Sequence, residues 1–254
     1  MLKPFLYISL CIAFVNSASA QKKYAASDIH SHNDYSRPEA FYHAFNAGAG
    51  AIEADVYLRN GRLVVAHDTT AAKQQLSFNK MYLQPFLKEF KARPRPLNLV
   101  IDLKEAYAPI LAELLKELKP LKSLIKSGNN NKTLSIIITG NRPPPALYNK
   151  YPTYITFDDD LQLPHTSEQW KRVAQVSLNF ENYSKWQGEG MLPPVDEKVL
   201  KSIINAVHAS GKRIRFWAAP DNKAGWQKLM ELKADILSTD KIDELKELLK
   251  KPGN

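Results

Sequence analysis

The chain has 254 residues, 44% of them hydrophobic, and a formal net charge of +9. A chain of this length can bury a large core, and its single cysteine, Cys11, excludes a disulfide scaffold. The basic residues are spread along predicted helices and are not interleaved with aromatic residues, so we expect no nucleic-acid partner. The positive charge instead suits anionic substrates or surfaces.

Residues 1–20 have the pattern of a secretory signal peptide. Lys3 precedes an apolar run from Phe5 to Val15, and Ala18-Ser19-Ala20 forms a small-x-small cleavage site before Gln21. The segment is too short to span a bilayer as a mature helix. Cys11 follows a leucine, where a lipoprotein signal would need a small residue, so no lipid anchor is expected. We expect a secreted or periplasmic protein that starts near Gln21, with residues 21–254 as one monomeric domain.

The first two predicted strands carry ionisable side chains in pairs. A strand over residues 27–32 places His30 and His32 on the same face, because side chains alternate along a strand. A second strand, over residues 51–58, places Glu53 and Asp55 on one face in the same way. Two buried acids cost several kcal/mol unless a cation or hydrogen bonds compensate them. A bound metal is the simplest compensation.

A hairpin is predicted directly after the second strand. Asn60-Gly61 is the strongest two-residue signal for such a turn, so residues 62–67 should fold back antiparallel on the strand that holds Glu53. His67 is then carried back toward the core. A lone histidine on an apolar strand is more often a core residue with a satisfied hydrogen bond, but the combination with the two acids favours a site.

The rest of the chain alternates between predicted helices and strands. Pro85 can break or restart the helix predicted over residues 78–92. The strand predicted over residues 97–103 brings Asp102 and Lys104 onto one face. Other helices are predicted at 37–47, 106–126, 145–150, 169–174, 195–210, 225–233 and 241–250, and other strands at 134–139, 153–157, 175–180, 213–219 and 235–238. Without the hairpin arm this gives eight strands, most followed by a helix, and predicts a single-domain (β/α)8 TIM barrel.

Active sites of such barrels lie at the carboxyl ends of the strands. Several polar residues fall there: His32, Asp55, Asp102, Arg142, Asp158, Trp217 and Asp240. Asn33, Glu53, Asp55 and Asp102 supply only oxygen ligands, which Ca²⁺ and Mg²⁺ prefer. The run from Asp158 to Asp160 is more typical of a solvated acidic turn, Arg142 could simply pair with a nearby acid, and Trp217 could pack against the barrel.

Four segments together resemble a known superfamily: H-N-D-Y, G-A-G-A-I-E-A-D-V, N-G-R-L-V-V-A-H-D and L-V-I-D-L-K, with A-D-I-L-S-T-D near the end. They are similar to the signature of glycerophosphodiester phosphodiesterases and phosphatidylinositol-specific phospholipases C. The resemblance covers residues 27–104 well and residues 213–249 more loosely. It implies a TIM barrel that hydrolyses a small-molecule or lipid-headgroup phosphodiester, with peripheral contact to a membrane surface as one consequence.

The resemblance also implies roles for individual residues. His32 matches the catalytic base, His67 the second catalytic histidine, and the ligands of a divalent cation match Asn33, Glu53, Asp55 and Asp102. Trp217 resembles a substrate-binding tryptophan late in the pattern. The His-Arg-Gly motif of glycerophosphodiesterases is absent, so Lys104 and Arg142 are the candidates for holding phosphate. Asp102 stands where a glutamate is more usual, which shortens the reach to the cation.

The mechanism implied is cation-assisted phosphodiester cleavage, in which His32 takes a proton from the attacking hydroxyl and His67 gives one to the leaving group. Two alternatives stay open. His30-Ser31-His32 resembles the H-x-H of zinc-type amidohydrolase-like barrels, which would need further histidines at later strand ends. A secreted barrel that binds its ligand without turnover is the third.

Overall fold

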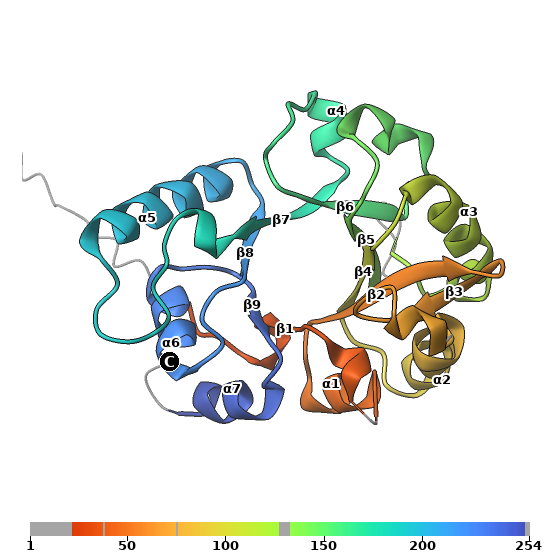
Figure 1. Cartoon of the computed structure of the whole chain (residues 1–254), viewed down its shortest axis with the longest axis horizontal. Helices are drawn as coiled ribbons and strands as arrows, with labels where there is room; N and C mark the ends of the chain where they lie inside the picture. The colour runs from red at the N-terminus through yellow and green to blue at the C-terminus, as the bar shows by residue number, and fades with distance from the viewer. Residues whose placement is uncertain (1–21, 38, 75, 127–132, 252–254) are drawn as a thin grey trace, which may run out of the picture.

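Eight parallel strands surround a common axis and form a nearly closed barrel with helices outside it (Figure 1). The computed structural model describes residues 22–37, 39–74, 76–126 and 133–251. The predicted signal peptide, with Cys11, lies outside these described residues. The predicted α/β class and the TIM-barrel architecture are confirmed.

The strands neighbour one another in the order β8-β7-β6-β5-β4-β2-β1-β9. Between β8 and β9 a single parallel bridge, Arg215 to Ile236, brings the two ends of the sheet together. The strands are β1 (Ile29–Ser31), β2 (Ala51–Arg59), β4 (Leu97–Leu103), β5 (Leu134–Gly140), β6 (Ile155–Asp159), β7 (Val173–Asn179), β8 (Arg213–Trp217) and β9 (Leu237–Thr239). The apolar runs in β4 and β5 explain their central place, because a parallel strand is buried on both faces.

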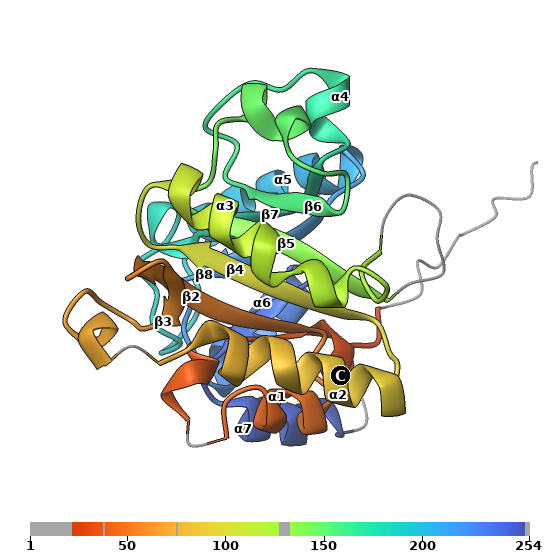
Figure 2. The ribbon, with the colours of Figure 1, turned by 90° about the vertical axis from the view of Figure 1, so that its right-hand side faces the viewer.

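Helices cover the outside of the strands (Figures 1 and 2). They are α1 (Tyr42–Ala47), α2 (Gln84–Ala92), α3 (Tyr107–Glu117), α4 (Ser167–Trp170), α5 (Pro194–Ala209), α6 (Lys223–Glu231) and α7 (Ile242–Leu249). The main core lies between the strands and this helical layer. In the part of the chain that the structure describes, no helix has both the length and the apolar character that crossing a bilayer requires.

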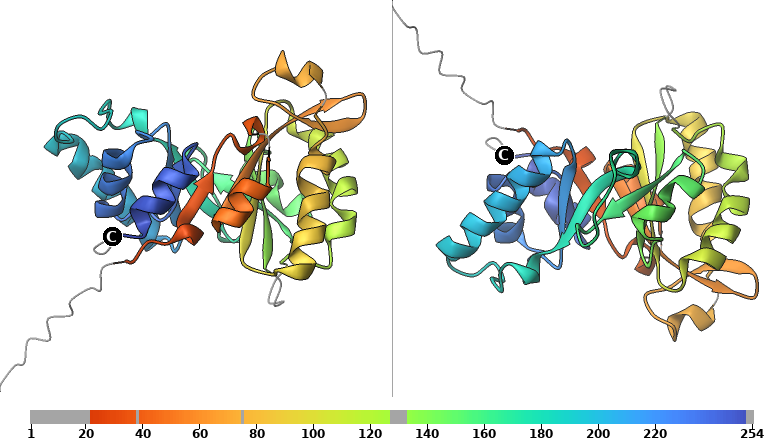
Figure 3. Two further views of the ribbon diagram at one scale, coloured as in Figure 1. Left: turned by 90° about the horizontal axis from the view of Figure 1, so that it is seen from below. Right: turned by 90° about the horizontal axis from the view of Figure 1, so that it is seen from above.

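The predicted hairpin is confirmed. β3 (Arg62–Val65) pairs antiparallel with β2. Arg62 lies opposite Arg59 next to the turn, and Val65 lies opposite Val56 at the other end of the pairing. Asn60 and Gly61 both have positive φ angles, 51° and 72°, as a two-residue turn of the I′ type requires. Figures 2 and 3 show that the hairpin extends outward past the neighbouring helices at one end of the barrel.

Two predicted helices are shorter than the pattern indicated. The helix predicted from residue 37 begins at Tyr42, because the buried Asp34 carboxylate accepts the backbone N–H of Phe41 at 2.5 Å and holds the preceding segment as a loop. The helix predicted to reach residue 126 ends at Glu117, since Pro120 cannot donate a backbone hydrogen bond. Pro85, by contrast, lies in the first turn of α2 and is tolerated there.

Two further predictions for the second half of the barrel are wrong. The helix predicted at 169–174 is the short α4, capped by Thr166, and β7 already begins at Val173. The acidic run at 158–160 is no solvated turn. Asp158 and Asp159 are the last residues of β6, and both are buried. Gln175 donates a hydrogen bond to Asp158, and His165 and Arg142 lie beside Asp159.

Candidate functional site

Three carboxylates converge inside the barrel. Glu53 and Asp55 share the interior face of β2, and Asp102 on β4 is the register partner of Asp55. One oxygen from each lies within 4.8 Å of the others. Glu53 and Asp55 are buried and Asp102 is half-buried. The structure therefore brings together three of the four predicted cation ligands.

Two cationic side chains neutralise only part of the negative charge of these carboxylates. Lys104 Nζ lies 2.9 Å from Asp55 Oδ2 and 2.7 Å from Asp102 Oδ2. On the other side, Arg215 Nη1 lies 3.0 Å from Glu53 Oε2. Three carboxylates thus face two permanent positive charges, which leaves room for a further cation.

The pKa values of the carboxyls reflect the crowding. Burial, followed by the charges of Glu53 and Asp102, raises the pKa of Asp55 to about 6. Burial also raises the pKa of Asp102. Burial alone would raise the pKa of Glu53, but the charge of Arg215 and the hydrogen bond from His30 hold it below its ordinary value. An all-oxygen set with this surplus of negative charge fits a hard divalent cation.

His30 supports Glu53 from beneath and is fully buried. Its Nε2 lies 2.5 Å from Glu53 Oε2, and its Nδ1 has no hydrogen-bond partner. Burial and then the neighbouring Arg215 charge lower the pKa of His30 to about 4, so the ring is neutral at pH 7 and Nε2 donates to the carboxylate. His30 therefore orients Glu53 and lies too deep to meet a substrate.

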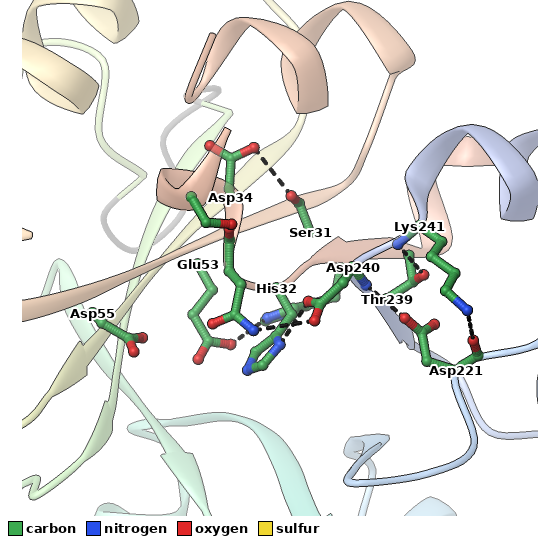
Figure 4. A network of polar contacts seen from close by, with 12 residues as sticks. Ser31, His32, Asp34, Glu53, Asp55, Asp221, Thr239, Asp240 and Lys241 are labelled. Atoms are coloured by element: carbon green, nitrogen blue, oxygen red, sulfur yellow. Dashed lines mark hydrogen bonds and ion pairs between the residues drawn. The ribbon is translucent and has the colours of Figure 1, made fainter. Parts of the chain in front are cut away.

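His32 is held by an acid from the far end of the chain. Its Nδ1 lies 2.8 Å from Oδ1 of Asp240, the residue that follows β9 (Figure 4). Burial alone would lower the pKa of His32, but the hydrogen bond to Asp240 and the charge of Glu53 outweigh it, and the pKa is raised. With the Nδ1 proton directed to Asp240, Nε2 is left to accept a proton.

Asn33 lies beside the carboxylates and is linked to them through a tyrosine. Its Oδ1 accepts a 2.7 Å hydrogen bond from Tyr35 Oη, which also lies 2.8 Å from Asp55 Oδ2. Its Nδ2 donates to Asp240 Oδ2 at 3.1 Å. Its φ of 46° lies in the left-handed region, which asparagine tolerates better than most residues. Asn33 thus joins the carboxylate cluster to the His32–Asp240 pair.

A cavity of about 580 Å³ opens over this group at the carboxyl ends of the strands. That size suits a small-molecule ligand. Trp217, 46% exposed, lies at its mouth. The other predicted site residues that line the cavity are His32, Glu53, Asp102, Lys104 and Arg142.

Arg142 is already engaged with acidic neighbours. Its Nη2 lies 2.8 Å from Asp160 Oδ1 and 3.7 Å from Asp159 Oδ2, and its Nε donates to Tyr148 Oη at 3.1 Å. The pairing with a nearby acid that the sequence left open is therefore present. Arg142 still lines the cavity, so its role toward phosphate stays a prediction.

His67 does not line the cavity that holds His32. It is exposed after β3 and lines a second hollow together with Asn33, Tyr35 and Asp240. Asp240 connects the two places, since it lines this hollow and binds His32. The role of His67 as general acid stays a prediction.

Sequence reasoning gave no role to Arg215, Asp158 or Asp240. Arg215 precedes Trp217 by two residues and so shares its face of β8, and a buried arginine in an apolar strand is a signal in itself. Asp158 belongs to the acidic run 158–160, whose composition is typical of a solvated turn. Asp240 was recognised only as a residue at a strand end, because its partner lies 208 positions away.

Part of the chain is similar to a known phosphodiesterase domain. Residues 19–96 match the AIM6-like phosphodiesterase domain family. The superfamily resemblance predicted from the sequence is thereby confirmed. The matched segment contains β1, β2 and the hairpin, and thus His32, Asn33, Glu53, Asp55 and His67.

Relatives extend over most of the chain. An altered inheritance of mitochondria protein 6 homolog from Arthroderma benhamiae is 24% identical, over 86% of this chain and 82% of that protein. The altered inheritance of mitochondria protein 6 of Saccharomyces cerevisiae is 25% identical, over 84% and 68%. A crystal structure assigned as a glycerophosphoryl diester phosphodiesterase from Silicibacter pomeroyi superposes with a TM-score of 0.58, at 11% identity, over 89% of this chain and 93% of that one. The last comparison shows a shared fold.

Substitution of Asp55 tests the cation site. We expect the purified protein to bind one Ca²⁺ or Mg²⁺, and Asp55→Ala to weaken that binding by about 10-fold or more, because one of three convergent ligands is lost. Isothermal titration calorimetry measures both affinities. Asp160→Asn is the matched control, since Asp160 lines the same cavity outside the cluster. Equal affinity of Asp55→Ala and the parent would contradict the assignment.

Proposed function

We propose that the protein is an exported, cation-dependent phosphodiesterase that hydrolyses a glycerophosphodiester or a phosphoinositide-type phosphodiester. The observation that carries the proposal is the convergence of three carboxylates and the His32–Asp240 pair at one cavity of a phosphodiesterase-like barrel. Carboxylates alone would suit many cations. A histidine that is oriented by an acid beside them adds a group that moves protons.

The cation would be held by Glu53, Asp55 and Asp102, with Asn33 adjacent. When bound, it would neutralise the phosphate and lower the pKa of an attacking hydroxyl. Ca²⁺ and Mg²⁺ both suit these oxygen donors. Lys104 and Arg142 line the same cavity and supply positive charge for the phosphate oxygens.

His32 acts as the general base in this proposal. Asp240 fixes the orientation of the ring and stabilises the imidazolium that forms once the proton has been taken from the attacking hydroxyl. His67 acts as the general acid toward the leaving alkoxide. Because His67 lies in the neighbouring hollow, the leaving group would extend toward Asn33 and Asp240.

The zinc-type alternative finds less support in the geometry. The carboxylate cluster contains three oxygen ligands, and within the described ranges the later histidines bind other acids. His165 Nε2 lies 2.8 Å from Asp159, and His208 Nε2 lies 2.8 Å from Asp235. A zinc site would need nitrogen ligands at these strand ends. A hydrolysis assay distinguishes the proposed enzyme from a barrel that binds its ligand without cleaving it.

Hydrolysis with and without a chelator tests the function. We expect release of a phosphomonoester or cyclic phosphate from a panel of glycerophosphodiesters and phosphoinositides, loss of that activity in EDTA, and recovery when Ca²⁺ or Mg²⁺ is returned. Phosphate-ester analysis of the products measures it. Recovery with Zn²⁺ alone would favour the amidohydrolase-like alternative. Binding of the substrates without cleavage under every condition would favour the binding barrel.

The leaving group separates the roles of the two histidines. His32→Ala and His67→Ala should each slow cleavage of alkyl phosphodiesters by roughly 10²–10⁴-fold. With a p-nitrophenyl phosphodiester, the leaving p-nitrophenolate needs little protonation. This substrate should therefore restore part of the cleavage rate of His67→Ala, whereas His32→Ala should stay slow. His208→Ala, in α5 and paired with Asp235, is the control. Restoration of His32→Ala alone would reverse the two roles, and near-parent rates of both variants on alkyl substrates would refute them.

The acidic limb of the pH profile tests the His32–Asp240 pair. A general base must be neutral, so activity falls as the pH drops below the pKa of His32. Asp240→Asn removes a charge that raises this pKa, and the limb should therefore move to lower pH while kcat decreases. The pH dependence of kcat/KM measures the shift. Asp235→Asn removes the acid of the His208 pair, which lies before β9 and away from Asp240, and should leave the limb in place. An unmoved limb in Asp240→Asn would contradict the role.

A further inference from the structure

The two positive groups at the carboxylate cluster differ in how firmly they are held. The Arg215 side chain is 4% exposed, whereas that of Lys104 is 27% exposed at the cavity. The backbone N–H of Lys104 donates to the carbonyl of Val56 at 3.1 Å, so the main chain is fixed and the side chain alone is able to turn. A lysine ammonium is a compact charge on a flexible stem. Arg215 is therefore a fixed counter-ion, and Lys104 is a displaceable one.

Lys104 binds the oxygens that a cation would need. Its Nζ lies 2.9 Å from Asp55 Oδ2 and 2.7 Å from Asp102 Oδ2. The other oxygen of Asp102 packs against Gly140, where a Cβ atom would lie 1.9 Å from Asp102 Oδ1. One side of Oδ1 is thus covered by backbone, which favours Oδ2 as the ligand of a cation. The ammonium of Lys104 already occupies a place beside that oxygen.

The ammonium and a divalent cation would repel each other at this place. A Ca²⁺ or Mg²⁺ ion binds carboxylate oxygens at about 2.0–2.6 Å, so an ammonium that stays within hydrogen-bond distance of the same oxygens lies only a few ångströms from the ion. Water screens like charges weakly in a site as buried as that of Glu53 and Asp55. The two positive groups therefore exclude each other from the same pair of oxygens.

We infer that the Lys104 ammonium competes with the divalent cation for Asp55 and Asp102 and leaves these carboxylates when the cation binds. This inference rests on the proposed function for the presence of a cation at the cluster. The released ammonium stays at the cavity that Lys104 lines, and its charge becomes available to an anionic ligand. Binding of the cation and binding of the anion are then coupled through one side chain.

Substitution of Lys104 by methionine tests the competition. Lys104→Met keeps the unbranched apolar stem and removes the charge. We expect it to bind Ca²⁺ or Mg²⁺ at least about 10-fold more tightly than the parent, because the internal competitor is lost. Isothermal titration calorimetry of the purified protein measures both affinities. A lysine that only supported the fold would give the opposite sign or no change when it is lost.

Lys116→Met is the matched control. Lys116 is an exposed lysine of α3 that pairs with Glu113, so its loss changes the net charge equally but away from the cluster. This variant should keep the parent affinity.

Thermal unfolding gives a second readout. In the absence of added cation, Lys104→Met should have a lower Tm than the parent, because three carboxylates then face Arg215 alone. The rise in Tm at a fixed Ca²⁺ concentration should be larger in the variant, because its affinity is higher. If Lys104→Met does not fold, Lys104→Arg decides the question. Its guanidinium binds carboxylates through paired donors and is harder to displace, so cation binding should weaken several-fold.

Three results would overturn the competition. They are an affinity of Lys104→Met equal to or below that of the parent, no cation binding by either protein, and, where only Lys104→Arg folds, an affinity equal to or above that of the parent. Hydrolysis is an independent readout. Tighter cation binding by Lys104→Met in a protein that cleaves no phosphodiester would support the competition and refute the proposed function. Cation-dependent cleavage by the parent with unchanged affinity in Lys104→Met would do the reverse.

Discussion

Burial of three negative charges within a few ångströms is the constraint on which the rest of this structure depends. Glu53, Asp55 and Asp102 could not share the barrel interior unless positive groups surrounded them. Those groups come from separate parts of the chain, Arg215 from β8 and Lys104 from the segment after β4. The charges can meet only when the sheet is nearly closed. The polar interior and the barrel topology therefore depend on each other.

Closure of the barrel also brings His32 and Asp240 together. β1 and β9 are the first and last strands and lie side by side, with Ser31 opposite Thr239. The residues that follow them, His32 and Asp240, consequently meet at the carboxyl end of the barrel. Asn33 binds the same acid, and so the loop after β1 is fixed by the end of the chain. A site built across this seam requires both ends of the barrel to be folded.

The sequence predicted what depends on local spacing. Alternation along a strand places Glu53 beside Asp55, and Asn60-Gly61 specifies the turn of the hairpin. Contacts between distant segments could not be predicted in this way. The partner of Arg215 lies across the barrel, and Asp158 is buried because Gln175 on the next strand binds it. His67 illustrates the same limit, since its placement depends on the path of a loop.

Arg215 connects the two walls of the cavity. Its Nη1 lies 3.0 Å from Glu53 Oε2, and its charge also opposes the rise in the pKa of Asp158 that burial causes. A guanidinium can serve both because its donors point in fixed, separate directions, whereas a lysine would offer a single point charge at the end of a flexible stem. The same side chain thus balances the charge of Glu53 on β2 and that of Asp158 on β6. Loss of Arg215 would therefore leave two buried carboxylates, one on β2 and one on β6, without the positive charge that they share.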